Sequence, residues 1–297
     1  MKRVLITGAN SYIGNAFSSW VKKKHDQDFA IEILDMMNSN WMCFDFQKYD
    51  AVFHVAGIAH ADVEKVGEKQ KELYYKVNRD LAIAVACKSK ESGVRQFILM
   101  SSMIVYGESA SLGKSKLITK ETKPSPSNFY GDSKLQADIA VRKLAGQNFN
   151  VAVIRPPMIY GANSKGNYST IVKLAKKLPF FPDIENERSA IYINNFCEFV
   201  TILINQGVGG IFFPQNREYI CTSDLLSEIA KVHQHKVILT KMLNPAIFIL
   251  NHTPIKYSKL VRKAFGNIVY DKSLSAFEMG YNVYSFEESI IESEGEV

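Results

Sequence analysis

Short aliphatic runs alternate with amphipathic stretches along the first half of the chain, and this alternation restricts the fold more than any other feature. Continuous apolar runs are typical of strands buried on both faces of a parallel sheet. Strands that alternate with helices build a doubly wound α/β sheet. We therefore predict this fold class, with parallel strands over residues 4–6, 30–34, 51–55, 97–100 and 151–154.

The stretches between the strands have helical periodicity. The apolar residues of 16–21 share one helical face, and Gly93 stands where a helix would end. Residues 107–128 lack periodicity and are expected to form a long loop beside the active site. Prolines and glycines interrupt the alternation after Arg155. We predict a cofactor-binding domain over 1–158, to which 188–206 return, and a smaller C-terminal substrate-binding subdomain over 159–187 and 207–297.

The charge and cysteine patterns argue against several other classes of protein. The net charge of +6 is spread over lysines without an arginine-rich run, so we expect no nucleic-acid partner. Four scattered cysteines without a CxxC pair favour reduced, packed thiols in the cytoplasm, and we predict no metal site. The apolar segment around 246–250 is too interrupted to span a membrane, although contact with a membrane surface stays open.

A glycine-containing turn follows the first predicted strand. Residues 7–14 read TGANSYIG and lead into the first helix, where a dinucleotide pyrophosphate binds backbone N–H groups. Gly8 would form the tight turn and Gly14 would allow close packing of helix and strand. Ser11 stands where a middle glycine is usual. The turn predicts a dinucleotide cofactor.

Asp35 ends the second predicted strand and indicates which dinucleotide binds. A carboxylate at this position accepts hydrogen bonds from the adenosine ribose and repels the additional phosphate of NADP. The sequence therefore favours NAD. The alternative is that Asp35 only caps a turn.

Tyr130 and Lys134 are four residues apart at the start of a predicted helix, so both project from one face. An ammonium ~4 Å from a phenol stabilises phenolate by about 4 kcal/mol at an effective dielectric constant near 20. This effect alone predicts a tyrosine that titrates near neutrality and acts as general base or acid. Ser102 follows the fourth strand, where its hydroxyl would bridge Tyr130 and a substrate oxygen.

Together these motifs resemble the extended short-chain dehydrogenase/reductase family, which contains Rossmann-fold epimerases, dehydratases and reductases of nucleotide sugars. The resemblance covers nearly the whole chain. It is carried by TGANSYIG at 7–14, Asp45-Phe46, HVAG at 54–57, Val77-Asn78, SSMIVYG at 101–107 and YGDSK at 130–134.

The resemblance implies NAD as cofactor and a UDP-sugar as substrate. It places Lys134 on the nicotinamide ribose, Pro157 beside the cofactor, and Asn167 and Arg188 on the substrate diphosphate. The alternative for Asn78 and His54 is that they are satisfied polar groups of the core. The further residues implied to bind NAD are Gly8, Ser11, Tyr12, Ile13, Gly14, Asp35, Asp45, Phe46, Ala56, Gly57, Asn78 and Tyr130.

Departures from the family pattern bear on the reaction. The family's 4,6-dehydratases carry acids where this chain has Met103 and Ile104, so dehydration is disfavoured. Met158 and Ala59 replace residues near the nucleotide and cofactor of UDP-galactose epimerases. We predict a UDP-sugar 4-epimerase that works through a 4-keto intermediate. The alternatives are a 4-keto sugar reductase and a non-catalytic NAD-binding sensor or scaffold. The resemblance also implies a homodimer formed through the helix after Tyr130.

Overall fold

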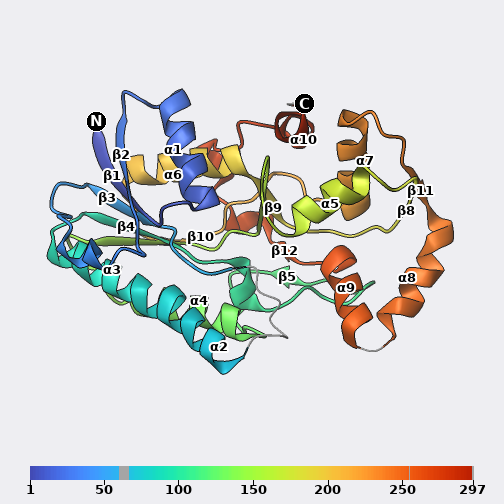
Figure 1. Cartoon of the computed structure of the whole chain (residues 1–297), viewed down its shortest axis with the longest axis horizontal. Helices are drawn as coiled ribbons and strands as arrows, with labels where there is room; N and C mark the ends of the chain where they lie inside the picture. The colour runs from blue at the N-terminus through green and yellow to red at the C-terminus, as the bar shows by residue number, and fades with distance from the viewer. Residues whose placement is uncertain (60–66, 254, 296–297) are drawn as a thin grey trace.

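The computed structural model describes residues 1–59, 67–253 and 255–295, and its central element is a six-stranded parallel sheet (Figure 1). The strand order is β10-β6-β4-β3-β1-β2. The doubly wound fold class is confirmed, as are the five strands predicted from sequence. The strands of this sheet are β1 (Lys2–Thr7), β2 (Phe29–Leu34), β3 (Ala51–His54), β4 (Gln96–Met100), β6 (Asn150–Ile154) and β10 (Gly210–Phe212).

Helices cover both faces of the sheet. On one face lie α1 (Tyr12–Lys24) and α6 (Ile193–Gln206), and on the other lie α2 (Glu68–Tyr75), α3 (Leu81–Glu91) and α4 (Phe129–Arg142) (Figure 1). Alternate strand residues enter opposite cores, as Ile6 packs with the α1 and α6 side and Leu5 with the α3 and α4 side. A π-helical turn, Lys76–Asp80, joins α2 to α3. Gly93 follows α3 with φ +76°, as expected for a residue that ends a helix.

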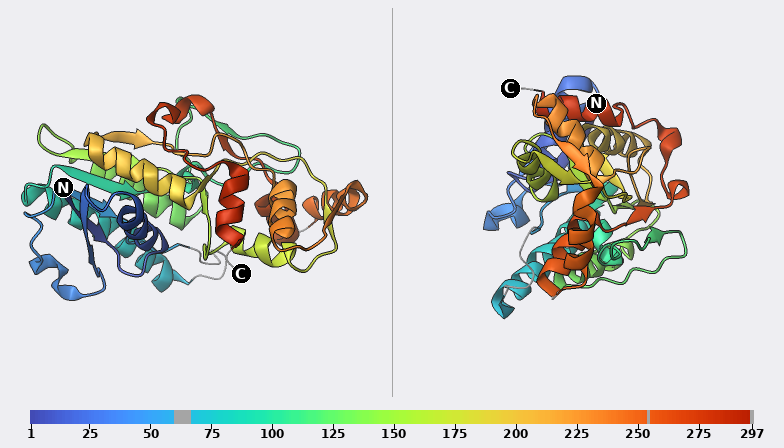
Figure 2. Two further views of the ribbon diagram at one scale, coloured as in Figure 1. Left: turned by 90° about the horizontal axis from the view of Figure 1, so that it is seen from above. Right: turned by 90° about the vertical axis from the view of Figure 1, so that its right-hand side faces the viewer.

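The other elements gather beyond the carboxyl ends of the strands, as Figures 1 and 2 show. Residues 210–212, which the sequence division assigns to the substrate-binding part, form the edge strand β10 of the main sheet. The loop 107–128 is mostly irregular but contains the short strand β5 (Leu117–Ile118). The helices here are α5 (Asn167–Ala175), α7 (Thr222–Val232), α8 (Asn244–Asn251), α9 (Ile255–Phe265) and α10 (Phe286–Glu294). The strands pair as β7 (Met158–Tyr160) with β9 (Ala190–Tyr192), β8 (Phe180–Pro182) with β11 (Ile238–Thr240), and β5 (Leu117–Ile118) with β12 (Val269–Tyr270).

The four cysteines lie in different environments, and short 3₁₀ turns connect the longer elements. The four cysteines are free; Cys197 is buried, but Cys43 is exposed, so the expectation that all four pack in the interior is wrong. Among the described residues, no helix is both long and apolar enough to cross a bilayer. The 3₁₀ turns are Ser39–Cys43, Met103–Tyr106, Lys241–Leu243, Lys272–Leu274 and Phe277–Met279.

Candidate active site

The turn after β1 has the backbone geometry that the glycines predict. Gly8 has φ +128°, and a Cβ there would lie 2.8 Å from the backbone nitrogen of Ala56. Gly14 lies against β1 and the segment after β3, because a Cβ there would be 3.1 Å from Ile6 Cγ2 and 3.2 Å from Val55 Cγ2. Larger residues would separate the first turn of α1 from the sheet at these two positions.

Ser11 caps α1, and its Oγ accepts a hydrogen bond from Gly14 N at 3.2 Å. In the described part of the chain, the backbone N–H groups of Tyr12 and Ile13 have no hydrogen-bond partner. These two donors lie at the positive end of a 13-residue helix, so they form a suitable cradle for an anionic pyrophosphate. The residues of this turn therefore fit a dinucleotide.

Two of the predicted cofactor residues place their side chains in the interior. Phe46 is 1% exposed and packs in the core below the sheet. The hydroxyl of Tyr12 is buried beside Gly161, and burial raises the pKa of this phenol above its ordinary value. Only the main chain of Phe46 is then available to a cofactor, whereas the ring of Tyr12 is half-buried and only its hydroxyl is enclosed.

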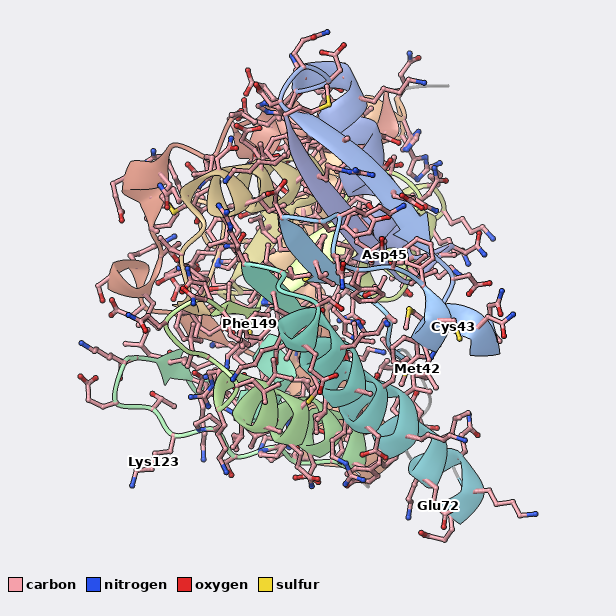
Figure 3. All side chains as sticks on the ribbon, turned by 90° about the vertical axis from the view of Figure 1, so that its left-hand side faces the viewer. Met42, Cys43, Asp45, Glu72, Lys123 and Phe149 are labelled. Atoms are coloured by element: carbon pink, nitrogen blue, oxygen red, sulfur yellow. The ribbon has the colours of Figure 1, made fainter. Side chains whose placement is uncertain are left out.

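Asp35 and Asp45 are both exposed and both close local turns. Asp35 Oδ1 accepts from Met37 N at 2.9 Å, and Asp45 Oδ1 accepts from Gln47 N at 2.9 Å. Figure 3 shows Asp45 close to the turn that carries Met42 and Cys43. Asp35 thus caps a turn, which is the alternative to ribose binding that the sequence left open. Its second carboxylate oxygen has no hydrogen-bond partner among the described residues, so the same carboxylate retains an acceptor for a ribose.

Asn78 and His54 are buried polar groups that join elements of the core. Asn78 Oδ1 accepts from Ile58 N at 2.8 Å, while its Nδ2 donates to Ile58 O at 3.1 Å and Ser133 Oγ at 3.2 Å. His54 Nδ1 pairs with Thr7 Oγ1 at 2.7 Å, and burial lowers the pKa of this imidazole to about 3. Asn78 therefore has the role of a hydrogen-bonded polar group of the core, because its side chain links residue 58 to α4. A cofactor contact by Asn78 stays a prediction.

Ser102, Tyr130 and Lys134 converge where β4 ends and α4 begins. Ser102 caps the 3₁₀ turn Met103–Tyr106, where its Oγ accepts from Ile104 N at 3.3 Å, and its hydroxyl lies near enough to that of Tyr130 to lower the pKa of the phenol. Lys134 is 7% exposed and its Nζ donates to Met100 O at 3.0 Å. A Cβ at Gly57 would lie 2.9 Å from this Nζ, so the segment after β3 borders the lysine. The structure brings the three predicted catalytic side chains together beside that segment.

The predicted acidity of Tyr130 is wrong for this structure. Burial raises the pKa of the phenol to about 12, and the nearby Ser102 hydroxyl offsets this rise only in part. Burial also lowers the pKa of Lys134 to about 8, and the amine donates to the Met100 carbonyl. The sequence argument considered only the attraction between charges. Desolvation is the larger effect here, and it favours the neutral forms of both groups.

A buried ionic bridge holds α4 against this site, and sequence reasoning missed it. Asp138 is fully buried and accepts from Arg142 Nε at 2.7 Å and Arg155 Nε at 2.8 Å. Arg155 also donates to the hydroxyl of Tyr106 at 2.7 Å, in the turn that Ser102 caps. The sequence does contain an indication of this bridge, because Asp138 lies one helical turn after Lys134 on the face that packs inward.

The predicted substrate residues lie on separate elements. Asn167 begins α5 after Gly166, which has φ +92°. Arg188 donates to Lys263 O at 3.1 Å and Gly266 O at 3.0 Å, and burial lowers the pKa of its guanidinium. No carboxylate pairs with Arg188 among the described residues, so its charge remains available to an anion. Pro157 is buried beside Pro156, whose carbonyl accepts from Met103 N at 2.9 Å.

Two curated relatives match much of the chain. The UDP-glucose 4-epimerase of Vibrio cholerae is 27% identical over 249 residues, which cover 77% of this chain and 75% of that protein. The N-acetyl-alpha-D-glucosaminyl-diphospho-ditrans,octacis-undecaprenol 4-epimerase of Escherichia coli O157:H7 is 26% identical over 228 residues, covering 70% and 64%.

Solved structures share the fold across nearly the whole chain. MoeE5 in complex with UDP-glucose and NAD has a TM-score of 0.73 at 13% identity and covers 99% of this chain and 97% of its own. A dTDP-4-dehydrorhamnose reductase from Clostridium acetobutylicum has a TM-score of 0.71 at 19% identity and covers 98% of each chain. The family model described as the NAD dependent epimerase/dehydratase family matches residues 4–212. The chain therefore belongs to the NAD-dependent epimerase/dehydratase family.

Proposed function

We propose that this protein is an NAD-dependent 4-epimerase of UDP-sugars. The observation that carries the proposal is that the hydroxyl of Ser102 lies near that of Tyr130, with Lys134 buried against Met100 O and Gly57. The name of the Vibrio relative supports a UDP-sugar, and the exposed carboxylate of Asp35 supports NAD over NADP. Met103 is buried and neither it nor Ile104 can transfer a proton, which argues against dehydration.

In this reaction each residue of the site would have a separate role. Bound NAD supplies the acceptor and donor of hydride at C4 of the sugar. Ser102 holds the 4-oxygen by a hydrogen bond, and Tyr130 takes the proton of the 4-hydroxyl and returns it after the 4-keto sugar turns over in the site. Lys134 and Gly57 would hold the nicotinamide end, the N–H groups of Tyr12 and Ile13 the pyrophosphate, and Arg188 the substrate diphosphate.

A specific observation keeps the 4-keto reductase as the second candidate. With a pKa of about 12, Tyr130 is protonated at neutral pH and is ready to donate to a keto oxygen. An epimerase needs the phenol first as a base, whereas a reductase needs it first as an acid. Starting from the 4-keto sugar, the protonation state described here is already the productive one.

The test is to incubate the protein with several UDP-sugars, with and without added NAD(H), and to identify products by mass spectrometry and NMR. The undecaprenol-linked sugar in the name of the Escherichia coli relative should be tested as well, since it too carries a diphosphate. Isomerised sugar without net cofactor change supports the epimerase. Stoichiometric oxidation of NADH supports the reductase. NAD binding without any product supports the sensor or scaffold.

Substitution of the phenol separates chemistry from binding. Tyr130→Phe should lower turnover by about 10² to 10⁴-fold while NAD affinity is kept. Tyr75→Phe, which removes only a 2.8 Å hydrogen bond to Asp132, is the control and should keep turnover. Full activity of Tyr130→Phe would refute the assigned role.

The remaining proposals concern the assembly and its compartment. A homodimer through α4 is proposed from the family resemblance, and light scattering of the purified protein measures it. We also propose a cytoplasmic location, which is consistent with the four free cysteines.

A further inference from the structure

The helices α8 and α9 lie side by side at the end of the molecule farthest from the parallel sheet (Figure 1). They and the residues just before them carry several exposed apolar side chains. Met242 is 88% exposed, Ile249 64% and Leu260 65%, which is unusual for large apolar side chains on one end of a soluble domain. We define the α8–α9 face as the exposed side chains of Ile238, Met242, Phe248, Ile249, Tyr257 and Leu260.

These side chains are not part of the core. Phe248 and Ile249 border an open hollow of about 680 Å³, which Asp183 and Glu185 also line. On α9, Tyr257 and Leu260 are three residues apart and point outward, while Val261 and Phe265 are buried. Each helix therefore has exposed apolar side chains in addition to those that pack toward the core.

The charge of the same segment is strongly biased. Residues 229–270 contain seven Lys and Arg and no Asp or Glu. In the rest of the chain 29 Lys and Arg face 30 Asp and Glu, so the positive net charge of the protein comes from this segment. Within this segment Lys236, Lys241 and Lys263 are exposed, and Lys241 lines the same hollow as Phe248 and Ile249. The segment that carries the α8–α9 face is thus cationic, and the acidic groups at the hollow, Asp183 and Glu185, come from outside this segment.

We propose that the α8–α9 face docks on the surface of an anionic lipid bilayer. Apolar side chains flanked by lysines match the interface of such a membrane, where the side chains enter the headgroup region and the ammonium groups meet lipid phosphates. A second copy of the chain is the less suitable occupant, because a two-fold interface would bring the two cationic surfaces against each other. Helices of 8 and 11 residues are too short to span the bilayer, so they lie on it. This inference does not depend on which sugar reaction the protein catalyses.

The test measures sedimentation of the full chain with vesicles of phosphatidylglycerol and phosphatidylcholine, and with vesicles of phosphatidylcholine alone. The wild type should bind the anionic vesicles, and binding should fall as salt is added. Phe248→Ser/Ile249→Ser should weaken binding at least about tenfold, because two side chains lose their burial in the lipid. Lys236→Glu/Lys241→Glu should weaken it by a similar factor at low salt.

Matched variants elsewhere on the molecule control for general hydrophobicity and charge. Val283→Ser/Ile291→Ser removes two exposed apolar side chains, and Lys22→Glu/Lys23→Glu reverses two exposed charges on α1. Both should bind vesicles as the wild type does. Circular dichroism checks that every variant is folded.

Three results would overturn the proposal. The first is a wild type that does not bind anionic vesicles. The second is a loss of binding in the control variants as large as in the variants of the face. The third is a wild-type oligomer that Phe248→Ser/Ile249→Ser converts to monomers, which would assign the face to a second copy of the chain.

Discussion

Replacing Lys134 by methionine should make the protein more stable at neutral pH while it loses its catalytic competence. Burial lowers the pKa of Lys134 from 10.5 to about 8. At about 1.4 kcal/mol per pKa unit, the folded state disfavours the charged amine by about 3 kcal/mol. Methionine carries no charge into the same space, but it leaves Met100 O without its 3.0 Å donor, which costs about 1 kcal/mol. The expected net gain at pH 7 is about 2 kcal/mol.

The sign of the pH dependence follows from the direction of the shift. Between pH 8 and 10.5 the unfolded chain binds a proton at this lysine that the folded chain does not, so the contribution of Lys134 to stability rises with pH. The advantage of Lys134→Met should therefore shrink by about 3 kcal/mol between pH 7 and pH 10.5 and become a small disadvantage.

Urea unfolding of wild type and variant across this pH range measures the difference in the free energy of unfolding. Lys88→Met is the control, because it also removes an amine that donates to a carbonyl, Met42 O, but at the surface. It should change stability by about 1 kcal/mol or less. A difference between Lys134→Met and wild type that stays constant from pH 7 to 10.5 would refute the reasoning.

Three further predictions follow from the site. Asp138→Asn should lower the free energy of unfolding, measured by heat or urea, by about 3–5 kcal/mol because Arg155, whose side chain is 4% exposed, loses its charged partner. Arg142→Met, at a side chain that is 37% exposed, should lower it by less than about 1 kcal/mol. Equal losses in the two variants would contradict the argument from burial. Gly8→Ala should abolish NAD binding in calorimetry, since the added Cβ would meet the backbone nitrogen of Ala56. Gly93→Ala, at a glycine that also has positive φ but has open space around it, should lower stability by only about 1–2 kcal/mol. Unchanged NAD binding by Gly8→Ala would disprove the role of the turn. Asp35→Ala should raise the affinity for NADP relative to NAD by about fivefold or more, and an unchanged ratio in binding titrations would argue against NAD selection by this carboxylate.

The sequence predicted the sheet because its information is local. Runs such as 97–100 and 151–154 are apolar throughout, and such runs suit strands that are buried on both faces. The turn at Gly8 is equally local, since positive φ and close backbone approach require glycine. The position of Ser102 after β4 and the spacing of Tyr130 and Lys134 then place three side chains at one end of the sheet.

Long-range contacts were beyond such reasoning. The strand β10 is short, and nothing in residues 210–212 indicates that they pair with β6 at the edge of the main sheet. The bridge from Asp138 to Arg155 joins residues 17 positions apart through the interior, and only the fold makes them neighbours. The inward positions of Tyr12 and Phe46 likewise depend on how α1 and the core pack.

The ionisation states of Tyr130 and Lys134 are the clearest case in which residue spacing and burial lead to opposite predictions. Spacing puts an ammonium and a phenol on one helical face, and charge attraction alone would make the phenol acidic. The fold buries both groups, and desolvation moves the pKa of Tyr130 up and that of Lys134 down, so both are driven toward their neutral forms. A buried protonated phenol needs a further positive charge at the site before it can act as a base, but it needs none to act as an acid. The order of proton transfer therefore depends on what the site binds, and the protein itself starts from the donor state.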